Sequence, residues 1–442
     1  MERCKLKRKL ISVILSLVIS VTLGQSVFAA ENSTPQAPPK LVAEAAIAID
    51  ANTGEVIYSK NLDQKVYPAS TTKLLTALIL AQYRKPSDIL TYTASAKSQP
   101  SAALNTDVKP LNPGDTMTAD NALKALLIFS ANDIAYMIAD NIIGNTNATV
   151  SQTNDAFSAL MNKKAAQLGL KDSHFVTPNG LHDPNHYTTA YDMSVIAKNA
   201  FENKWILSTM EIPKTVVETT NGTQFPIENR NKLILPSETS LYDSTCLAGK
   251  TGYTNEAGKC LVAIFDRNGR KIIGVIMKSA YDANDTQSFK DMEAMINYSY
   301  SINYTTLEAK NTTYKTENVS YKPLFFFGPT ETVKVPLVIN QNIQYYKNDV
   351  NDKEKKLTSN VSPINLWKLN SNNPIGTLTL TERGVTKNYK LYSGISTSTI
   401  ISDNKYIYIG IGAILLILIV LIIISIVKLI GKFKKKRRRY YY

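Results

Sequence analysis

The chain has 442 residues and a formal net charge of +14, because 50 Lys and Arg outnumber 36 Asp and Glu. The excess lies at the two ends: residues 1–9 carry +4 and residues 428–442 carry +8, which leaves +2 for everything between. A nearly neutral middle excludes the extended basic surface on which nucleic-acid binding depends. A content of 44% hydrophobic and 19% charged residues also excludes a disordered or fibrous chain.

The N-terminal end has the features of an export signal. A basic stretch precedes an apolar run of about 15 residues, and the small residues Ala29 and Ala30 follow it. This order is typical of a secretory signal peptide over residues 1–30, cleaved after Ala29 or Ala30, and the run is short for a spanning helix. The Pro-rich residues 31–40 are expected to form a linker.

Apolar periodicity and turn residues then predict one α+β domain over residues 41–304. Two strands joined by a turn at Asp50–Gly54 come first, helices occupy the middle, and three strands and a helix follow. The sheet is therefore expected to close over a long helical insertion. The expected strands cover residues 44–50, 55–59, 245–252, 259–266 and 271–278, and the expected helices cover residues 70–83, 119–129, 131–142 and 286–299.

The composition changes after residue 304. Residues 305–400 are rich in Thr, Asn, Val, Tyr and Lys, and Pro and Gly interrupt short alternating runs, which favours a small all-β domain. Residues 396–405 are polar, and we expect them to form a short stalk.

The C-terminal end is expected to be a membrane anchor. Residues 406–427 contain no charge and, as a helix, would be about 33 Å long, enough to cross a bilayer core. The basic tail 428–442 marks the cytoplasmic side. We therefore expect a single-pass protein of the cell membrane with residues 31–405 on the extracytoplasmic side.

Two of the three cysteines, Cys246 and Cys260, would remain after the signal peptide is removed. They flank an expected hairpin with its turn near Asn255. In that register Cys260 faces Lys250 and Cys246 faces residue 264, so the thiols are not opposed. Two free, buried thiols are favoured over a disulfide.

Three short motifs carry side chains suited to nucleophilic chemistry. Ser70 and Lys73 stand three residues apart, on one face of an expected helix, where a desolvated lysine can act as base toward a hydroxyl. At the junction of the two middle helices, the hydroxyl of Ser130 suits proton relay and the carboxamide of Asn132 suits holding a substrate amide. Each residue alone also fits a structural role, such as a helix cap.

The third motif, Lys250-Thr251-Gly252, occurs once and lies on an expected strand. Lys250 and Thr251 are suited to receive a carboxylate, and Gly252 would let a substrate backbone approach the sheet edge. A literal Ser-Asp-Asn at Ser402-Asp403-Asn404 resembles the second motif, but it follows the third motif and lies against the membrane segment, so we reject it.

Taken in order, the three motifs resemble those of the penicillin-recognising serine acyltransferases. More closely, the chain resembles the low-molecular-mass penicillin-binding proteins that act as serine D-alanyl-D-alanine carboxypeptidases, strongly over residues 40–300 and more weakly beyond. The resemblance implies a β-lactamase/transpeptidase-like domain with a five-stranded antiparallel sheet and helices, followed by a small all-β domain and the transmembrane helix. Supporting segments are Ser130–Asp133, His174–Phe175, Thr177–His182, Asn231–Leu233, Lys250–Thr254, Glu256–Gly258 and Cys260–Val262.

The resemblance also implies catalytic roles. Ser70 would be the acylated nucleophile, Lys73 its general base, and Ser130 the residue that passes the proton to the leaving D-alanine. The implied substrates are peptidoglycan stem pentapeptides, and β-lactams are the implied covalent inhibitors of Ser70. The resemblance implies no cofactor.

Binding roles follow from the same resemblance. Asn132 would bind the peptide, Lys250 and Thr251 of the Lys250-Thr251-Gly252 motif would bind the terminal carboxylate, and the backbone N–H groups of Ser70 and Tyr253 would form the oxyanion hole.

The three histidines fall within thirteen residues, at His174, His182 and His186. Their spacings of eight and four match no structural zinc set, and the window holds no Cys or Glu. We expect no metal and favour roles in ordering a loop.

Three other functions compete. A class A β-lactamase needs a glutamate between the second and third motifs, and none occurs from 133 to 201. The later glutamates lack Asn four residues on, so we do not favour this function: Glu202, Glu211, Glu218, Glu228 and Glu238. A D,D-endopeptidase shares all three motifs and stays open as an alternative. A non-catalytic penicillin or cell-wall-binding protein also stays open, although the short C-terminal tail leaves no room for a signalling domain.

Overall fold

The computed structural model describes residues 37–438 except residue 326. The expected signal peptide and its cleavage site lie outside the described residues. By its internal contacts the chain divides into two units, Met1–Pro38 and Pro39–Tyr442. All the helices and strands that are described belong to the second unit.

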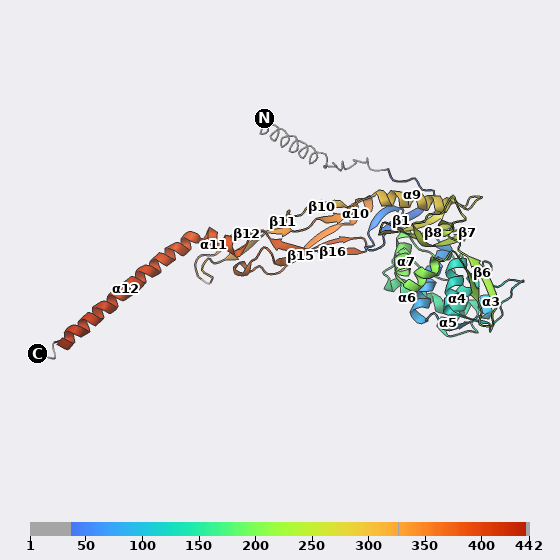
Figure 1. Ribbon diagram of the computed structural model, residues 1–442, viewed down its shortest axis with the longest axis horizontal. Helices are drawn as coiled ribbons and strands as arrows, with labels where there is room; N and C mark the ends of the chain where they lie inside the picture. Colours follow the sequence, from blue (N-terminus) through green and yellow to red (C-terminus); the bar gives the residue numbers. More distant parts are fainter. Residues whose placement is uncertain (1–36, 326, 439–442) are drawn as a thin grey trace, which may run out of the picture. The chain divides into compact units, whose positions relative to one another are not determined.

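A five-stranded antiparallel sheet forms the first part of this unit, in the order β2-β1-β9-β8-β7 (Figure 1). This confirms the fold class expected from the sequence. Strand β1 of the first hairpin pairs with β9, the last strand of this sheet in the sequence, and Ala45 of β1 lies opposite Met277 of β9. The strands are β1 (Ala45–Asp50), β2 (Val56–Lys60), β7 (Cys246–Thr254), β8 (Gly258–Arg267) and β9 (Arg270–Ser279).

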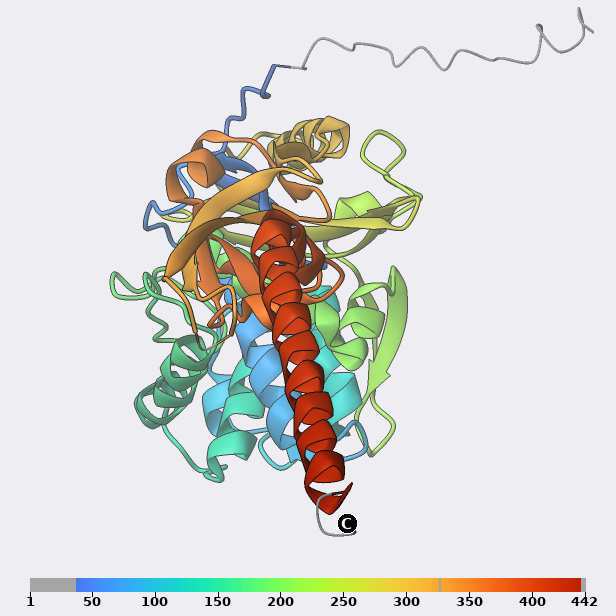
Figure 2. The ribbon, with the colours of Figure 1, turned by 90° about the vertical axis from the view of Figure 1, so that its left-hand side faces the viewer.

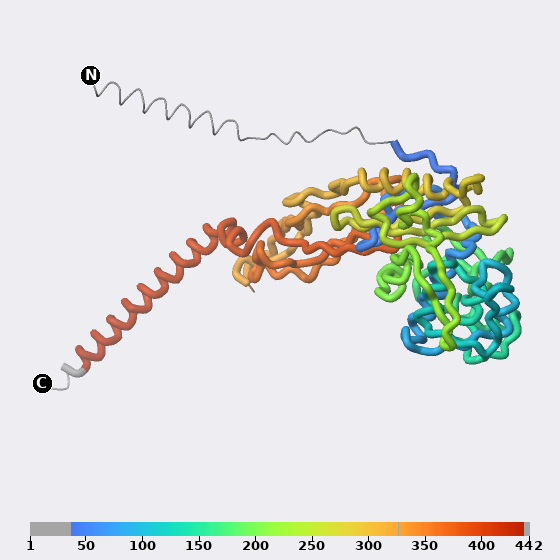
Figure 3. Tube along the Cα trace, turned by 45° about the vertical axis from the view of Figure 1, so that its right-hand side comes forward, coloured from blue at the N-terminus to red at the C-terminus, as the bar shows by residue number. Residues whose placement is uncertain are grey.

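Both faces of this sheet are buried. Along β1, alternate residues belong to two cores: Ile47 packs with the helical layer, whereas Ala46 packs with α9 (Gln287–Ser301) on the other face. Figures 1 and 3 show α9 along one face and the helices α4 to α7 beyond the other. Gly274 permits the close approach of α9, because a Cβ there would stand 2.4 Å from the sulfur of Met292. The buried stripe of α9 consists mainly of Phe289, Met292, Met295 and Ile296, as the sequence predicted.

The helical layer is built around α2 (Lys73–Tyr83), in which every residue from Lys73 to Leu80 is buried. A 3-10 turn, η1 (Ala69–Thr72), precedes it and holds Ser70. The predicted pair of middle helices is also confirmed as α4 (Ala119–Lys124) with the π-helical turn η2 (Ala125–Phe129), and α5 (Asn132–Ile143).

Several elements of the insertion were not predicted. The helix α6 is an example, because its buried side chains form only a narrow stripe along an otherwise polar sequence. These elements are β3 (Ile89–Thr91), α3 (Ala94–Lys97), β4 (Thr116–Thr118), α6 (Val150–Gln167), α7 (Ala190–Glu202), α8 (Lys204–Met210), β5 (Lys214–Glu218), β6 (Gln224–Glu228) and η3 (Lys232–Ile234).

Residues 305–403 build a second antiparallel sheet in the order β11-β12-β16-β15-β14, together with a short β10-β13 pair. The expected stalk is wrong: residues 397–403 form a helix, because Ile400 buries its side chain with Leu366 and Leu369. The elements are β10 (Thr305–Glu308), β11 (Thr313–Tyr321), β12 (Glu331–Ile339), β13 (Ile343–Tyr345), α10 (Asp349–Glu354), β14 (Lys356–Val361), η4 (Leu366–Lys368), β15 (Pro374–Glu382), β16 (Val385–Ser393) and α11 (Thr397–Asp403).

Polar contacts join this second region to the first hairpin. The buried carboxylate of Glu55, beside β2, pairs with Lys387 of β16 at 2.5 Å and accepts a hydrogen bond from Tyr304 at 3.0 Å. Glu382 lies beside the same lysine, at 3.5 Å, but neither of its buried oxygens has a hydrogen-bond partner within the described chain.

The last element, α12 (Lys405–Arg438), is one uninterrupted helix (Figure 2). Its most apolar stretch has a mean hydropathy of 3.4, and none of that stretch is buried inside the protein. Its length and composition allow it to cross a bilayer.

Cys246 and Cys260 are free and buried, as predicted. The predicted register of their hairpin is wrong by two residues, because Cys260 pairs with Gly252 and Lys250 pairs with Val262. The turn is centred on residue 256 rather than on residue 255, and Gly258 supplies its left-handed residue at φ +61°.

Candidate active site

Ser70 is held at the mouth of a pocket by the turn η1, which leads directly into α2. Two glycines pack against the backbone of this turn. At Gly180, which has φ +80°, a Cβ would stand 1.9 Å from the carbonyl oxygen of Ala69. At Gly252, a Cβ would stand 3.0 Å from the amide nitrogen of Ser70. No larger residue fits either place without moving Ser70.

The contact at Gly252 gives this glycine a structural role in addition to the one expected from the sequence, which was to open the sheet edge to a substrate backbone. The side of its Cα that a side chain would occupy faces the protein's own chain, since backbone atoms of Pro68 and Thr71 would also stand 3.1 Å from a Cβ at this position. Gly252 therefore lets β7 lie directly against the turn that carries Ser70.

Lys73 lies one turn after Ser70 and is fully buried. Its Nζ is 2.7 Å from the Oγ of Ser70, 2.8 Å from the Oδ1 of Asn132 and 2.8 Å from the carbonyl oxygen of Asn179. The structure thus brings the first two sequence motifs into direct contact, and three oxygens fix the amine in place.

Ser130 and Lys250 form a second pair across the pocket. Ser130 ends the π-helical turn η2 in a left-handed conformation, with φ +71°, which is uncommon for a residue with a side chain. Its Oγ accepts a hydrogen bond from the Nζ of Lys250 at 2.8 Å. The same Nζ donates to the carbonyl oxygen of Thr251 at 2.8 Å, so the second and third motifs also meet.

Both lysines are shifted toward their neutral forms. Burial lowers the pKa of Lys73 well below its ordinary value of 10.5, and the positive charges of Lys250 and Arg230 lower it further. Burial also lowers the pKa of Lys250 to about 7, with a smaller contribution from Arg230. A lysine with a depressed pKa supplies a lone pair at neutral pH, which a general base requires.

The position of Asn132 is fixed from both ends of its amide. Its Oδ1 accepts from Lys73, and its Nδ2 donates to the carbonyl oxygen of Pro100 at 3.2 Å. The next residue, Asp133, is fully buried and accepts hydrogen bonds from the amides of Leu104 and Asn105. The start of α5 therefore clamps the loop that forms one wall of the pocket.

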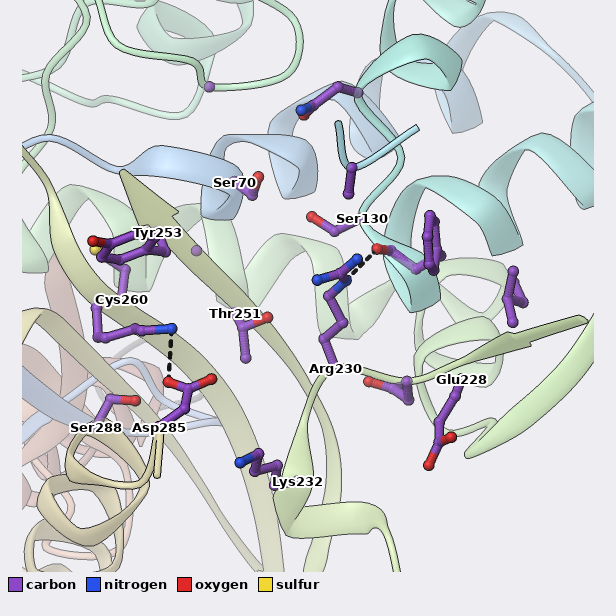
Figure 4. Close-up of a pocket in the computed structure, with 18 of the residues that line it drawn as sticks. Ser70, Ser130, Glu228, Arg230, Lys232, Thr251, Tyr253, Cys260, Asp285 and Ser288 are labelled. Atoms are coloured by element: carbon purple, nitrogen blue, oxygen red, sulfur yellow. Dashed lines mark hydrogen bonds and ion pairs between the residues drawn. The ribbon is translucent and has the colours of Figure 1, made fainter. Parts of the chain in front are cut away.

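The pocket has a volume of about 780 Å³ (Figure 4). In this view Ser70, Ser130 and Thr251 come from three separate elements around one opening, and Arg230 and Tyr253 lie toward opposite sides of it. Tyr253 is 43% exposed at the rim. Of the residues proposed from the sequence, Ser70, Ser130, Asn132, Thr251, Gly252 and Tyr253 line the pocket, while Lys73 and Lys250 lie beneath its surface.

Sequence reasoning missed two contributors. Arg230 lines the pocket, donates to the carbonyl oxygen of Phe129 at 2.6 Å and stacks on the Phe129 ring at 4.8 Å. The carbonyl of Asn179 holds Lys73. A backbone carbonyl has no signature in a sequence, but the Asn179-Gly180 dipeptide is a turn signal that marks a special backbone.

The histidines order the loop around residues 174–188. His186 is 2% exposed, and its Nδ1 accepts from the amides of Val176 and Thr177 at 3.1 and 3.2 Å. Its Nε2 therefore carries the proton and donates to the Oγ1 of Thr72 at 2.9 Å. Burial lowers the pKa of His186 to about 3, so the ring stays neutral. With both nitrogens in use, this ring is not available to a metal.

Two solved structures share the fold that carries this site. The D-alanyl-D-alanine carboxypeptidase of Mycobacterium tuberculosis H37Rv is 25% identical, with a TM-score of 0.54 over 61% of this chain and 96% of that one. A DD-transpeptidase of Streptomyces, 24% identical, has a TM-score of 0.54 over 60% of this chain and 100% of that one, and shows the fold alone. Fold and site together define a peptidase of the penicillin-binding class.

The sequence comparisons specify the family. A family model described as D-alanyl-D-alanine carboxypeptidase matches residues 31–280, more than half of the chain. A D-alanyl-D-alanine carboxypeptidase of Bacillus subtilis, DacF, is 27% identical over 85% of this chain and 91% of its own length. Another from Escherichia coli, DacD, is 32% identical over 62% and 67%. The chain belongs to the D-alanyl-D-alanine carboxypeptidase family and is a serine peptidase, which confirms the resemblance drawn from the three motifs.

Proposed function

We propose that the protein removes the terminal D-alanine from peptidoglycan stem pentapeptides through an acyl-enzyme on Ser70. The observation that carries this proposal is the 2.7 Å contact between the Oγ of Ser70 and the Nζ of a fully buried Lys73. The family and its relatives support the substrate class, since they are D-alanyl-D-alanine carboxypeptidases.

The surroundings of Lys73 explain how its neutral amine would act as the base. A neutral amine has two N–H groups and one lone pair. The carbonyl oxygens of Asn132 and Asn179, both at 2.8 Å, accept the two hydrogens. The lone pair then points to the hydroxyl of Ser70, which donates its proton as Oγ attacks the carbonyl carbon of the penultimate D-alanine.

Ser130 and the residues around it would complete the acylation half of the reaction. Ser130 gives its proton to the amide nitrogen of the departing D-alanine and regains one from the ammonium of Lys73, so that the C–N bond breaks as the ester on Ser70 forms. Lys250 and Thr251 bind the terminal carboxylate of the substrate. Because the pKa of Lys250 is about 7, an arriving carboxylate raises it and fixes the positive charge. Water then hydrolyses the ester and releases the shortened peptide.

The backbone N–H groups of Ser70 and Tyr253 would form the oxyanion hole. The contact of Gly252 with the turn at Ser70 supports this assignment, because it holds the two backbone segments against each other. β-Lactams would acylate the same hydroxyl and so act as covalent inhibitors.

We further propose the arrangement of the chain at the cell surface. Residues 41–304 form the catalytic domain, residues 305–400 a small β domain that keeps the active site off the membrane, and residues 406–427 a single span with the tail 428–442 in the cytoplasm. The signal peptide is cleaved after Ala29 or Ala30. The length and exposure of α12 support this anchor.

Incubating the purified full-length protein with a pentapeptide that ends in D-Ala-D-Ala tests the activity. Release of free D-alanine is expected, and its absence would refute the carboxypeptidase. A crosslinked peptide dimer in a parallel reaction separates this activity from the endopeptidase alternative, for which the dimer would be the preferred substrate.

A fluorescent penicillin tests the nucleophile. Labelling should be lost in Ser70→Ala and retained in Ser402→Ala, a control variant in the Ser402-Asp403-Asn404 sequence that was rejected above. Labelling of Ser70→Ala at the wild-type rate would contradict the assignment of Ser70. A protein that is labelled but never releases D-alanine would be a non-catalytic penicillin-binding protein.

A further inference from the structure

Two large apolar side chains stand in solvent on the loop between β11 and β12. Phe325 is 62% exposed and Phe327 is 73% exposed. Both belong to a tight turn in which the amide of Phe325 donates to the carbonyl oxygen of Lys322 at 3.1 Å. Large exposed apolar patches mark protein or membrane interaction sites. We call Phe325 and Phe327 the aromatic tip.

The aromatic tip is attached to a folded base and is therefore held in position. The ring of Phe325 stacks on Trp367 of η4, with the centroids 4.4 Å apart and the planes at 27°. Trp367 in turn packs on the small core that contains Leu366 and Ile400. Phe325 also has φ +61°, a left-handed conformation that is uncommon outside glycine. Stacking on Trp367 is an interaction that holds the residue in this conformation.

Two hydrogen bonds place this loop beside the start of α12. The Oη of Tyr408, in the first turn of α12, donates to the carbonyl oxygen of Pro323 at 2.9 Å. The Nδ2 of Asn404, just before α12, donates to the Oη of Tyr321 at 2.7 Å. The loop therefore lies at the level at which the chain enters its uncharged segment.

That level is also where the apolar surface of α12 begins. Tyr406 is 77% exposed and Ile409 is 65% exposed, and the uncharged sequence continues from there to residue 427. Trp and Tyr are enriched at the water–lipid boundary, and Phe is among the apolar residues with which interfacial segments enter the boundary between headgroups and acyl chains. The exposed rings of the aromatic tip therefore lie at the same level as the start of the exposed apolar surface of α12.

We propose that Phe325 and Phe327 insert into the interfacial layer of the lipid bilayer and form a second membrane contact beside α12. This inference rests on the proposed membrane anchor. Lipid is the occupant that the observations favour, because the surface of α12 next to the tip is itself suited to lipid. Two points of contact would restrict the tilt of residues 305–403 over the membrane more than α12 alone.

Site-directed spin labelling of the full-length protein in lipid nanodiscs tests the proposal. A nitroxide is attached to Phe327→Cys, and its collision rates with oxygen and with a water-soluble nickel chelate are measured by power saturation. Cys246 and Cys260 do not interfere, because both are buried and burial raises the pKa of each thiol. Unsubstituted protein treated with the same reagent measures any background signal.

Two reference positions make the outcomes distinguishable. Ile417→Cys, in the middle of α12, reports whether the helix spans, and Val108→Cys, which is 88% exposed on a loop of the insertion, reports water. We expect oxygen collisions to exceed nickel collisions severalfold at residues 327 and 417, and the reverse at residue 108. Nickel access at 327 equal to that at 108 would overturn the proposal while leaving the anchor intact. Low access of both reagents at 327 would also overturn it, in favour of a protein partner. Nickel access at 417 would overturn the anchor itself.

Discussion

Replacing Gly180 by alanine should disturb the catalytic centre without altering any side chain that takes part in it. The new Cβ would stand 1.9 Å from the carbonyl oxygen of Ala69 and 2.7 Å from the Oγ1 of Thr72. Both atoms belong to the turn that carries Ser70. The neighbouring carbonyl of Asn179 is also one of the three oxygens that hold Lys73. Either the turn or the loop must move.

The structure allows the size of the effect to be worked out. A left-handed conformation costs an L-residue about 1–2 kcal/mol, and forcing extra volume into a packed site costs about 1–3 kcal/mol more. We therefore expect a loss of stability of about 2–5 kcal/mol. If the oxygen of Asn179 moves away, the buried amine of Lys73 loses an acceptor, which costs about 1–3 kcal/mol and corresponds to a roughly 5- to 150-fold slower acylation.

Gly144→Ala is the matched control. Gly144 has φ +75°, but a Cβ there would have no described atom within 4 Å, so alanine at this position meets the conformational cost alone. Thermal unfolding and the rate of labelling by a fluorescent penicillin are measured on both variants. Gly180→Ala should unfold at a lower temperature than Gly144→Ala and should be labelled more slowly, whereas Gly144→Ala should be labelled at the wild-type rate. Equal behaviour of the two variants would refute the argument from crowding.

Three further predictions concern charge and burial. Arg230→Gln should raise the pKa values of Lys73 and Lys250, so the midpoint of the rise of the acylation rate with pH should move to higher pH. Lys232→Gln, which also removes a positive charge from the pocket lining, should leave this midpoint unchanged. Equal shifts in the two variants would contradict a specific effect of Arg230 on the two lysines. Glu382→Gln should stabilise the protein by about 1–3 kcal/mol at pH 8, because burial and the neighbouring Glu55 raise the pKa of this carboxyl more than Lys387, 3.5 Å away, lowers it. A carboxyl whose pKa is higher in the folded than in the unfolded protein destabilises the folded protein as pH rises from the unfolded pKa through the folded one. The stability gained by Glu382→Gln should therefore vanish near pH 4. A gain that persists there would exclude an effect of ionisation. Finally, burial raises the pKa of Cys246 to about 12 and that of Cys260 to about 11, so both thiols should react with a disulfide reagent at pH 8 only after unfolding, and rapid reaction of the folded protein would contradict their burial.

Much of the fold could be predicted because its signals are local and regular. Periodicity and turn residues predict the first hairpin (β1 and β2), the helix after Ser70 (α2) and the last three strands of the first sheet (β7, β8 and β9). All of them are present. The expected stalk was wrong because a polar sequence hides the single apolar contact of Ile400 that makes residues 397–403 a helix. The hairpin register was wrong because a left-handed Gly258 moves the turn by one residue, which shifts the pairs next to the turn by two; beyond a bulge between Cys246 and Ala248 the shift is one.

The candidate site, like the fold, could be predicted from the sequence only in part. Motif spacing identified Ser70, Lys73, Ser130 and Lys250, and the structure brings these four side chains around one pocket, two by two. Motif spacing gave no indication of Arg230, because its effect is a charge acting through space on two lysines far away in the sequence. It also gave no indication of the close approach between Gly252 and the turn at Ser70, which is visible only in three dimensions.

The pairing of β1 with β9 has a consequence for how the protein reaches its working state. Ala45 finds Met277 only after roughly 230 residues have been made, and closing such a loop is slow because the entropic cost precedes the reward from long-range contacts. The turn at Ser70 rests on β7 through Gly252, and β7 is joined to β1 only through β8 and β9. The turn that carries Ser70 therefore reaches its described position only after β7 has been made, about 180 residues later in the chain. The candidate site is thus one of the later parts of this domain to become complete during synthesis.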